Sequence, residues 1–161
     1  MVKLPTELIS PKEYIYCSFF SFSNHLQLLG DRKKQALSTK QSLVLAAIAL
    51  FDDYVLSLKD IASLVGTSSQ NVKKIVVILE KKGFAHIKRD ERDARSLRIA
   101  LTDKGKAYYK EKATESKQAL ETIFQGFDDE RIQRLYSDLR DLMDNILKEV
   151  GKKNYGDMQE N

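Results

Sequence analysis

Residues 84–106 read FAHIKRDERDARSLRIALTDKGK. Apolar and polar residues alternate over residues 85–88 and again over residues 97–101, which predicts two half-buried antiparallel strands. Between them lie three arginines and three acids, with no apolar side chain larger than Ala94. A segment without larger apolar groups has little to bury in a core. The sequence therefore predicts a β-hairpin whose charged tip projects from the protein.

Two short helices are predicted directly before this hairpin. Ser57 and Asp60 have the spacing of a capping box at the start of the first helix, and Gly66 can end it. The second helix covers residues 68–82, with either Ser68 as N-cap or a capping box between residues 67 and 70. Its apolar residues share one face: Val72, Ile75, Val76 and Leu79. Two helices joined by a tight turn match a helix-turn-helix.

Longer helices are predicted on both sides of this core. Apolar residues recur every three or four positions over residues 13–36, and a helix buried on most sides follows the capping-box pair Ser38 and Gln41. After the hairpin, Thr102 can cap a helix over residues 103–126, and a last helix covers residues 128–150. The predicted fold is mainly α with a small antiparallel hairpin. One compact domain need not cover all these apolar faces, which favours a symmetric homodimer.

The positive charge of the chain is concentrated in its centre. The 161 residues carry a net charge of +4, but residues 66–110 hold 12 Lys/Arg and 5 Asp/Glu, a balance of +7. A localised basic region is the electrostatic footprint expected for a nucleic-acid partner. A solvated charged face is the alternative interpretation.

Other classes of protein receive no support from the sequence. Cys17 is the only cysteine, which excludes an internal disulfide and fits a reducing cytoplasm. No apolar run reaches the length of a membrane span, and the first residues lack the pattern of a signal peptide, so we expect a cytoplasmic protein without a membrane partner. His25 and His86 lie far apart without metal-ligand spacing, and no nucleophile or phosphate-loop motif is present. We expect no metal, no cofactor and no enzymatic activity.

The polar residues of the second short helix and of the hairpin tip are the candidate DNA-binding residues. Amide, hydroxyl and lysine side chains at the start of such a helix can reach base edges and phosphates in the major groove. Arginine on a projecting ribbon suits the narrow minor groove of A·T-rich DNA, and Asp93 is placed to orient Arg95. The candidate residues are Ser68, Ser69, Gln70, Asn71, Lys73, Lys74, Arg92, Asp93 and Arg95. An ordinary helical pair beside a solvated hairpin remains the alternative.

Residues 37–105 also resemble the MarR family of winged helix-turn-helix transcriptional regulators. The resemblance rests on Asp93-Ala94-Arg95 followed after five residues by Leu101-Thr102, on the stretch IASLVGTSSQNVKKIVVILEKKGF, and on the helix start at residues 38–41. It implies a DNA-binding core at residues 37–105, an N-terminal arm and dimerisation helix at 1–36, dimerisation helices at 106–150 and a polar tail at 151–161. It also implies a homodimer on a near-palindromic operator, acting as a repressor modulated by a small ligand.

Weaker signals lie in the first predicted helix. Tyr14, Cys17 and Phe20 are candidates for an effector pocket, and the family includes regulators that sense oxidants through a cysteine in this helix. However, the apolar neighbours of Cys17 would raise the pKa of its thiol, so we expect a structural core cysteine. Two alternative functions remain: a winged-helix module that binds protein without direct DNA binding, and a redox-sensing regulator that uses Cys17.

Overall fold

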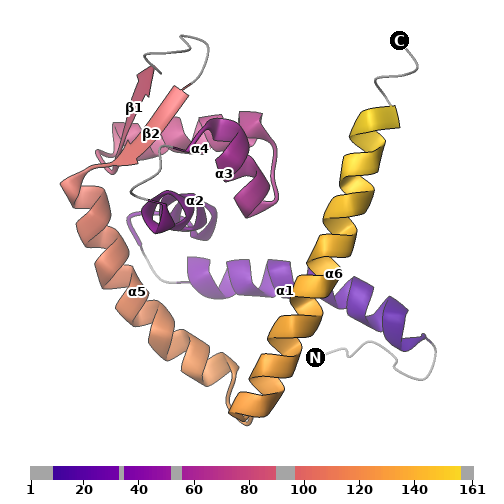
Figure 1. Cartoon of the computed structure of the whole chain (residues 1–161). Coiled ribbons are helices and arrows are strands. Elements are labelled where there is room, and N and C mark those ends of the chain that lie inside the picture. Colours follow the sequence, from indigo (N-terminus) through magenta and orange to yellow (C-terminus); the bar gives the residue numbers. More distant parts are fainter. Residues whose placement is uncertain (1–8, 33–34, 52–55, 90–96, 157–161) are drawn as a thin grey trace. The chain divides into compact units, whose positions relative to one another are not determined.

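The computed structural model describes residues 9–32, 35–51, 56–89 and 97–156 (Figure 1). The predicted tip residues Arg92, Asp93 and Arg95 lie outside these ranges. The chain divides into two compact units, residues 1–114 and residues 115–161, and each is described by itself.

The first unit contains four helices that all begin at a serine N-cap. They are α1 (Pro11–Asp31), α2 (Thr39–Leu50), α3 (Leu58–Val65) and α4 (Ser69–Lys81). Capping boxes are present at the starts of α1, α2 and α3. In each, the side chain of the third helical residue accepts a hydrogen bond from the backbone amide of the serine N-cap. In α3, hydrogen bonds from the side chain and backbone of Ser57 hold the pKa of the Asp60 carboxyl below its ordinary value. Helix α4 is capped by Ser68 alone, which settles the choice left open by the sequence.

A two-stranded antiparallel sheet follows α4. Strand β1 (Ala85–Arg89) pairs with β2 (Leu97–Leu101), and Ile87 lies opposite Ile99. Leu56 forms an isolated bridge to Ile99 on the other edge of β2. Strand β1 contacts α4, so the hairpin extends from the end of that helix (Figure 1). The predicted hairpin is thereby confirmed.

The core of the first unit lies between α2, α3, α4 and the hairpin. Its fully buried side chains come from all these elements and include Leu45, Ile61, Val72, Leu79 and Ile99. The predicted apolar face of α4 is buried. Helix α2 was predicted to be buried on most sides, but it buries only Val44, Leu45, Ala47 and Ile48 and leaves Leu43 and Leu50 exposed, because the core contacts one side of it. The predicted mainly α, winged helix-turn-helix fold is therefore confirmed.

Helix α5 (Asp103–Ile123) begins against the junction of α4 and β1. The Thr102 hydroxyl accepts a hydrogen bond from the Gly105 amide at 3.0 Å, which confirms Thr102 as a cap. The ring of Phe84 packs on Tyr108, with 5.1 Å between centroids. A Cβ atom at Gly105 would collide with the backbone oxygen of Phe84. Glycine is therefore required for this close approach.

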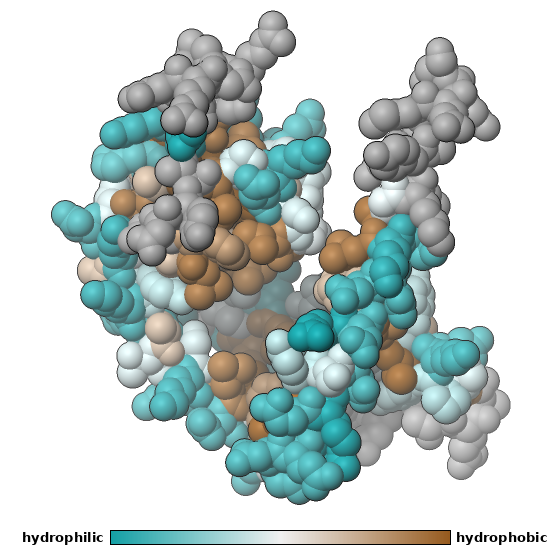
Figure 2. All heavy atoms as spheres, in the orientation of Figure 1, coloured by the Kyte–Doolittle hydropathy of each residue, from teal (hydrophilic) through white to brown (hydrophobic). Residues whose placement is uncertain are grey.

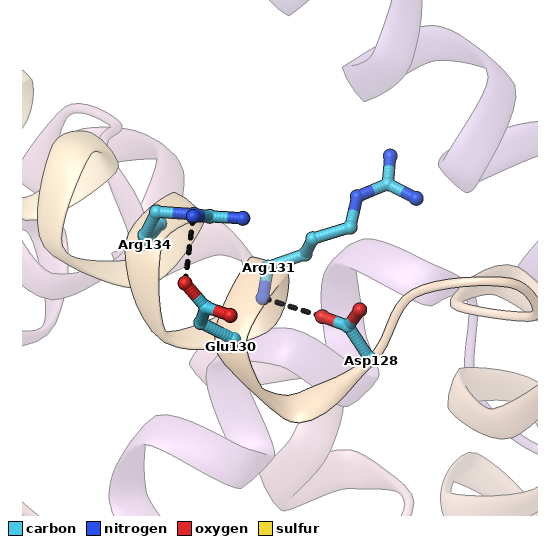
Figure 3. A network of polar contacts seen from close by, with 4 residues as sticks. All are labelled: Asp128, Glu130, Arg131 and Arg134. Carbon is cyan, nitrogen blue, oxygen red and sulfur yellow. Dashed lines mark hydrogen bonds and ion pairs between the residues drawn. The ribbon is translucent and has the colours of Figure 1, made fainter.

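The second unit contains the end of α5 and helix α6 (Asp129–Gly156). At the start of α6, the Asp128 carboxylate accepts a hydrogen bond from the Arg131 amide at 2.8 Å. Glu130 and Arg134 form an exposed ion pair at 2.8 Å (Figure 3). Both acids thus lie at the N-terminal end of α6, where negative charge is favoured.

Large apolar side chains remain exposed in both units (Figure 2). Those of α1 are Tyr14, Ile15, Tyr16, Phe20, Phe22, Leu26, Leu28 and Leu29, and those of α6 are Tyr136, Leu139, Met143, Ile146, Leu147 and Val150. Within the described ranges, no helix is long and apolar enough to span a membrane.

Several predicted helix boundaries differ from the structure, and α5 ends at Ile123 rather than at residue 126. Helix α1 begins at Pro11, because Ser10 and Glu13 form a capping box that the sequence analysis missed. It ends at Asp31 rather than near residue 36, because the Asp31 carboxylate accepts hydrogen bonds from the Thr39 amide and hydroxyl at 2.8 and 2.6 Å, where α2 starts. At the other end of the chain, α6 continues six residues beyond the predicted limit at residue 150.

Gly105→Ala should lower the free energy of unfolding by about 1–3 kcal/mol, because the added methyl group overpacks a rigid backbone contact. The matched control is Gly151→Ala, where an added Cβ meets nothing within 4 Å. That variant should be neutral or up to about 1 kcal/mol more stable, since alanine favours helix. Chemical denaturation at one protein concentration measures both. Equal stability of Gly105→Ala and wild type would contradict this account of the junction.

Candidate nucleic-acid interface

Helix α4 has one buried face and one exposed polar face. Val72, Val76 and Leu79 are at most 1% exposed and fix the helix on the core. Ser69, Gln70, Lys73 and Lys74 are exposed. Because residues three and four apart share a helix face, Gln70 and Lys73 or Lys74 project from the first two turns on the same side. The structure thus brings these four candidate residues together on one accessible surface.

Two further candidates in this helix have structural roles. The Ser68 hydroxyl accepts a hydrogen bond from the Asn71 amide at 3.2 Å and caps the helix. The half-buried Asn71 side chain donates from Nδ2 to the Thr67 hydroxyl at 3.0 Å. Its amide is therefore engaged with the turn before α4, which makes Gln70 the better placed amide for reading a base.

The described part of the hairpin carries basic residues toward the tip. Lys88 and Arg98 lie opposite each other, one pair beyond Ile87 and Ile99. The Lys88 side chain is exposed, whereas Ile99, in the middle of the ladder, is buried. Apolar residues thus hold the base while cationic residues lie farther out. This distribution of apolar and basic residues along the hairpin is the one expected for a projecting, positively charged ribbon.

Two lysines of the basic segment serve the fold. Lys82 Nζ donates to the Ala36 carbonyl at 2.6 Å, and Lys104 Nζ donates to the Lys82 carbonyl at 2.7 Å. Lys104 Nζ also lies 4.5 Å from the centroid of the Phe84 ring. The excess of +7 over residues 66–110 therefore overstates the charge available to a polyanion. Lys104 thus binds a carbonyl at the C-terminal end of α4, whereas Lys82 binds a carbonyl in the segment before α2.

A cavity of about 500 Å³ lies between α1, α2 and the α3–α4 turn. Apolar side chains form part of its wall, including Leu26, Val44 and Ile75, while Thr39, Lys40 and Asn71 supply polar groups. Tyr14, Cys17 and Phe20 are not among its lining residues, so the predicted effector set does not form this pocket. The sequence could not reveal it, because its walls come from four separate segments.

Cys17 is exposed in the chain, as are Tyr14 and Phe20. The expectation of a core cysteine is therefore wrong for the isolated chain. The apolar residues around Cys17 lie on a face of α1 that the first unit leaves uncovered. Among the residues that the structure describes, no group of His, Cys, Asp and Glu could hold a metal ion.

The comparisons with known proteins agree with this geometry. The model of the MarR family matches residues 37–96. A MarR protein from Peptoclostridium difficile superposes with a TM-score of 0.79 at 22% identity, over 92% of this chain and 95% of that one. Staphylococcus aureus MepR, in a complex with DNA, gives a TM-score of 0.74 at 19% identity, with 83% and 97% covered.

A third structure is the transcriptional regulator PcaV from Streptomyces coelicolor, solved with its natural ligand. It superposes with a TM-score of 0.69 at 16% identity, over 89% of this chain and 98% of that one. At these identities the likeness shows a shared fold. No curated protein sequence matches the chain. Residues 37–96, which include α2, α3, α4 and β1, thus match the model of the MarR family, and the similar structures share the winged helix-turn-helix fold.

Proposed function

We propose that this protein is a sequence-specific, double-stranded DNA-binding regulator of transcription that acts as a homodimer. The observation that carries the proposal is the exposed polar face of α4, held on a buried apolar face and followed directly by a basic hairpin. A helix fixed in this way presents its first turns to the major groove. The match of residues 37–96 to the MarR family model and the DNA complex of the similar MepR structure support the same activity, that of a regulator and not an enzyme.

In the proposed complex, α4 and the hairpin have different tasks. Gln70 reads a base edge, while Lys73 and Lys74 bind phosphates or guanine. Arg95, oriented by Asp93 and assisted by Arg92, enters the minor groove beside an A·T-rich segment. Contacts to phosphate supply most of the affinity and make it strongly dependent on salt.

The homodimer is proposed from the uncovered apolar faces of α1 and α6. Ile146 is 46% exposed and Val150 is 53% exposed, although both occupy the apolar stripe of α6. Contiguous apolar surface of this kind marks an interaction site. A two-fold dimer presents two copies of α4, which predicts a near-palindromic operator with half-sites about 34–36 Å apart.

We further propose that the protein is a repressor whose DNA affinity is modulated by a small ligand in the cavity beside α4. The cavity has the apolar walls and few polar groups typical of ligand sites. Asn71 lines it and also holds Thr67 at the start of the reading helix. A ligand that engages this amide would disturb the turn before α4. The ligand-bound PcaV structure, which shares the fold, supports this regulation.

Gln70→Ala and Lys74→Ala should weaken DNA binding in distinguishable ways. Loss of the Gln70 amide should reduce discrimination at one base pair by about 1–3 kcal/mol. Loss of the Lys74 charge should weaken all sequences equally and reduce the slope of log affinity against log salt by about one. Fluorescence anisotropy with operator variants at several salt concentrations measures both effects. Lys117→Ala, an exposed lysine of the second unit, is the control and should leave the slope unchanged.

Arg95→Ala should reduce operator affinity roughly tenfold or more while the thermal unfolding temperature stays at its wild-type value. The loss arises because a guanidinium no longer enters the minor groove. Replacing A·T by G·C pairs in the operator flanks should weaken the wild type and have little effect on Arg95→Ala. If Arg95→Ala binds as tightly as the wild type, the hairpin tip has no part in recognition.

Ile146→Glu should dissociate the homodimer, because it places a charge within the proposed apolar interface. Sedimentation velocity measures the change in mass, and the DNA affinity should fall with it. Asn145→Glu introduces the same side chain at an exposed polar position one residue earlier and should remain dimeric. A dimeric Ile146→Glu variant would remove this stripe from the interface.

A further inference from the structure

The hairpin is attached to the reading helix through a side chain that the sequence did not single out. Glu80, in the last turn of α4, accepts a hydrogen bond through Oε1 from the Ile87 amide of β1 at 2.9 Å. Glu80 itself is exposed. The bond joins the element proposed to read the major groove to the element proposed to enter the minor groove.

The pairing of the strands explains why the Ile87 amide needs this partner. The Thr102 amide donates to the Phe84 carbonyl at 3.1 Å, so these two residues form a hydrogen-bonded pair at the base of the ladder. In an antiparallel ladder, hydrogen-bonded and non-hydrogen-bonded pairs alternate. With Ala85 opposite Leu101, Ile87 and Ile99 then form a non-hydrogen-bonded pair. The Ile87 amide consequently points away from β2, toward Glu80.

The same level of the hairpin is also held on its other edge. Ile99, opposite Ile87, forms the isolated bridge to Leu56. Glu80, Ile87, Ile99 and Leu56 thus lie in one line across the sheet, which we call the wing brace. Beyond it, only the pairs Lys88–Arg98 and Arg89–Leu97 continue the described ladder. The brace therefore anchors the described hairpin on both of its edges.

The rigid end of α4 makes Glu80 an effective anchor. Gly83, with φ at 76°, closes the helix, and the Phe84 amide donates to the Leu79 carbonyl at 2.8 Å. The Gly83 amide donates to the Glu80 carbonyl, also at 2.8 Å. These bonds form a Schellman motif that fixes the direction of the chain as it leaves the helix. Glu80 adds a second point of attachment further along β1, which limits rotation of the hairpin about Gly83.

We propose that Glu80 is a positioning residue that sets the direction of the hairpin relative to α4, so that the tip meets the minor groove when α4 occupies the major groove. This inference rests on the proposed DNA-binding function and assigns a role that requires no contact between Glu80 and DNA. The acceptor oxygen, rather than the negative charge, performs it.

Two uncharged variants separate the acceptor from the charge. Glu80→Gln keeps a side-chain oxygen acceptor, whereas Glu80→Met has similar length and helix propensity without that acceptor. Amide hydrogen exchange of the DNA-free protein, followed by NMR, should show faster exchange at Ile87 in Glu80→Met than in Glu80→Gln. Thermal unfolding checks that both variants fold, and Glu80→Ala replaces Glu80→Met if the latter does not.

DNA binding then tests the positioning role. The ratio of affinities for operators with A·T and G·C flanks should be about threefold to tenfold smaller in Glu80→Met than in Glu80→Gln, the range expected from loss of one hydrogen bond. Discrimination at the base pair read by Gln70 should be equal in the two variants. Equal flank ratios, or equal Ile87 exchange, would overturn the proposal.

Failure of the underlying function has a different signature. If the wild-type protein binds duplex DNA without any preference between the flanks, the minor-groove role of the hairpin fails, and the positioning role of Glu80 fails with it. If the wild type has that preference and Glu80→Met keeps it in full, only the inference about Glu80 fails.

Discussion

The close contact between Phe84 and Gly105 is the constraint on which the first unit depends. Three elements meet there, because α4 has just ended, β1 begins at the next residue and α5 starts beside them. The backbone of Phe84 leaves no space for a Cβ atom at position 105. Its ring packs on Tyr108, and its carbonyl accepts a hydrogen bond from the Thr102 amide at the base of the hairpin. Helix α4, the hairpin and the start of α5 are therefore all held at this one contact.

Lysine side chains near this junction have structural roles, whereas other lysines of the basic segment are exposed candidates for DNA binding. Lys104 binds the Lys82 carbonyl at the end of α4, and Lys82 reaches back to the Ala36 carbonyl before α2. Each satisfies a carbonyl that the end of a helix or a loop leaves without a partner. Lys73 and Lys74 lie on the exposed face at the other end of α4. Lysine therefore stabilises the C-terminal end of α4, while the lysines nearer its N-terminal end remain available to a partner.

Local patterns made most of the fold predictable from the sequence. The three/four spacing of Val72, Ile75 and Leu79 specifies the buried face of α4, and the period of two specifies both strands. Capping signals gave the starts of α2 and α3. The apolar spacing alone places the start of α1 near residue 13. The capping box between Ser10 and Glu13, with Pro11 at the first helical position where proline is favoured, gives the true start. A serine followed three residues later by an acid or amide thus marks the start of α1, α2 and α3.

Contacts between distant segments could not be predicted in this way. Glu80 looked like one more exposed acid of an amphipathic helix, and only the position of β1 gives its carboxylate a partner. The cavity beside α4 likewise depends on where α1 crosses α2, which the hydrogen bonds between Asp31 and Thr39 determine. Such features follow from tertiary geometry that no periodicity encodes.

The apolar stripe of α4 is buried within the chain, whereas the apolar stripes of α1 and α6 are exposed and available to a partner. In α4 the apolar stripe of Val72, Ile75, Val76 and Leu79 is buried by the same chain, so α4 needs no partner for its position. In α1 and α6 equally regular stripes remain exposed. Each buried square ångström of such surface contributes about 25 cal/mol, so leaving two helical faces in water is costly. A second copy of the chain offers the same uncovered faces, and their mutual burial would turn two separate reading helices into one symmetric unit.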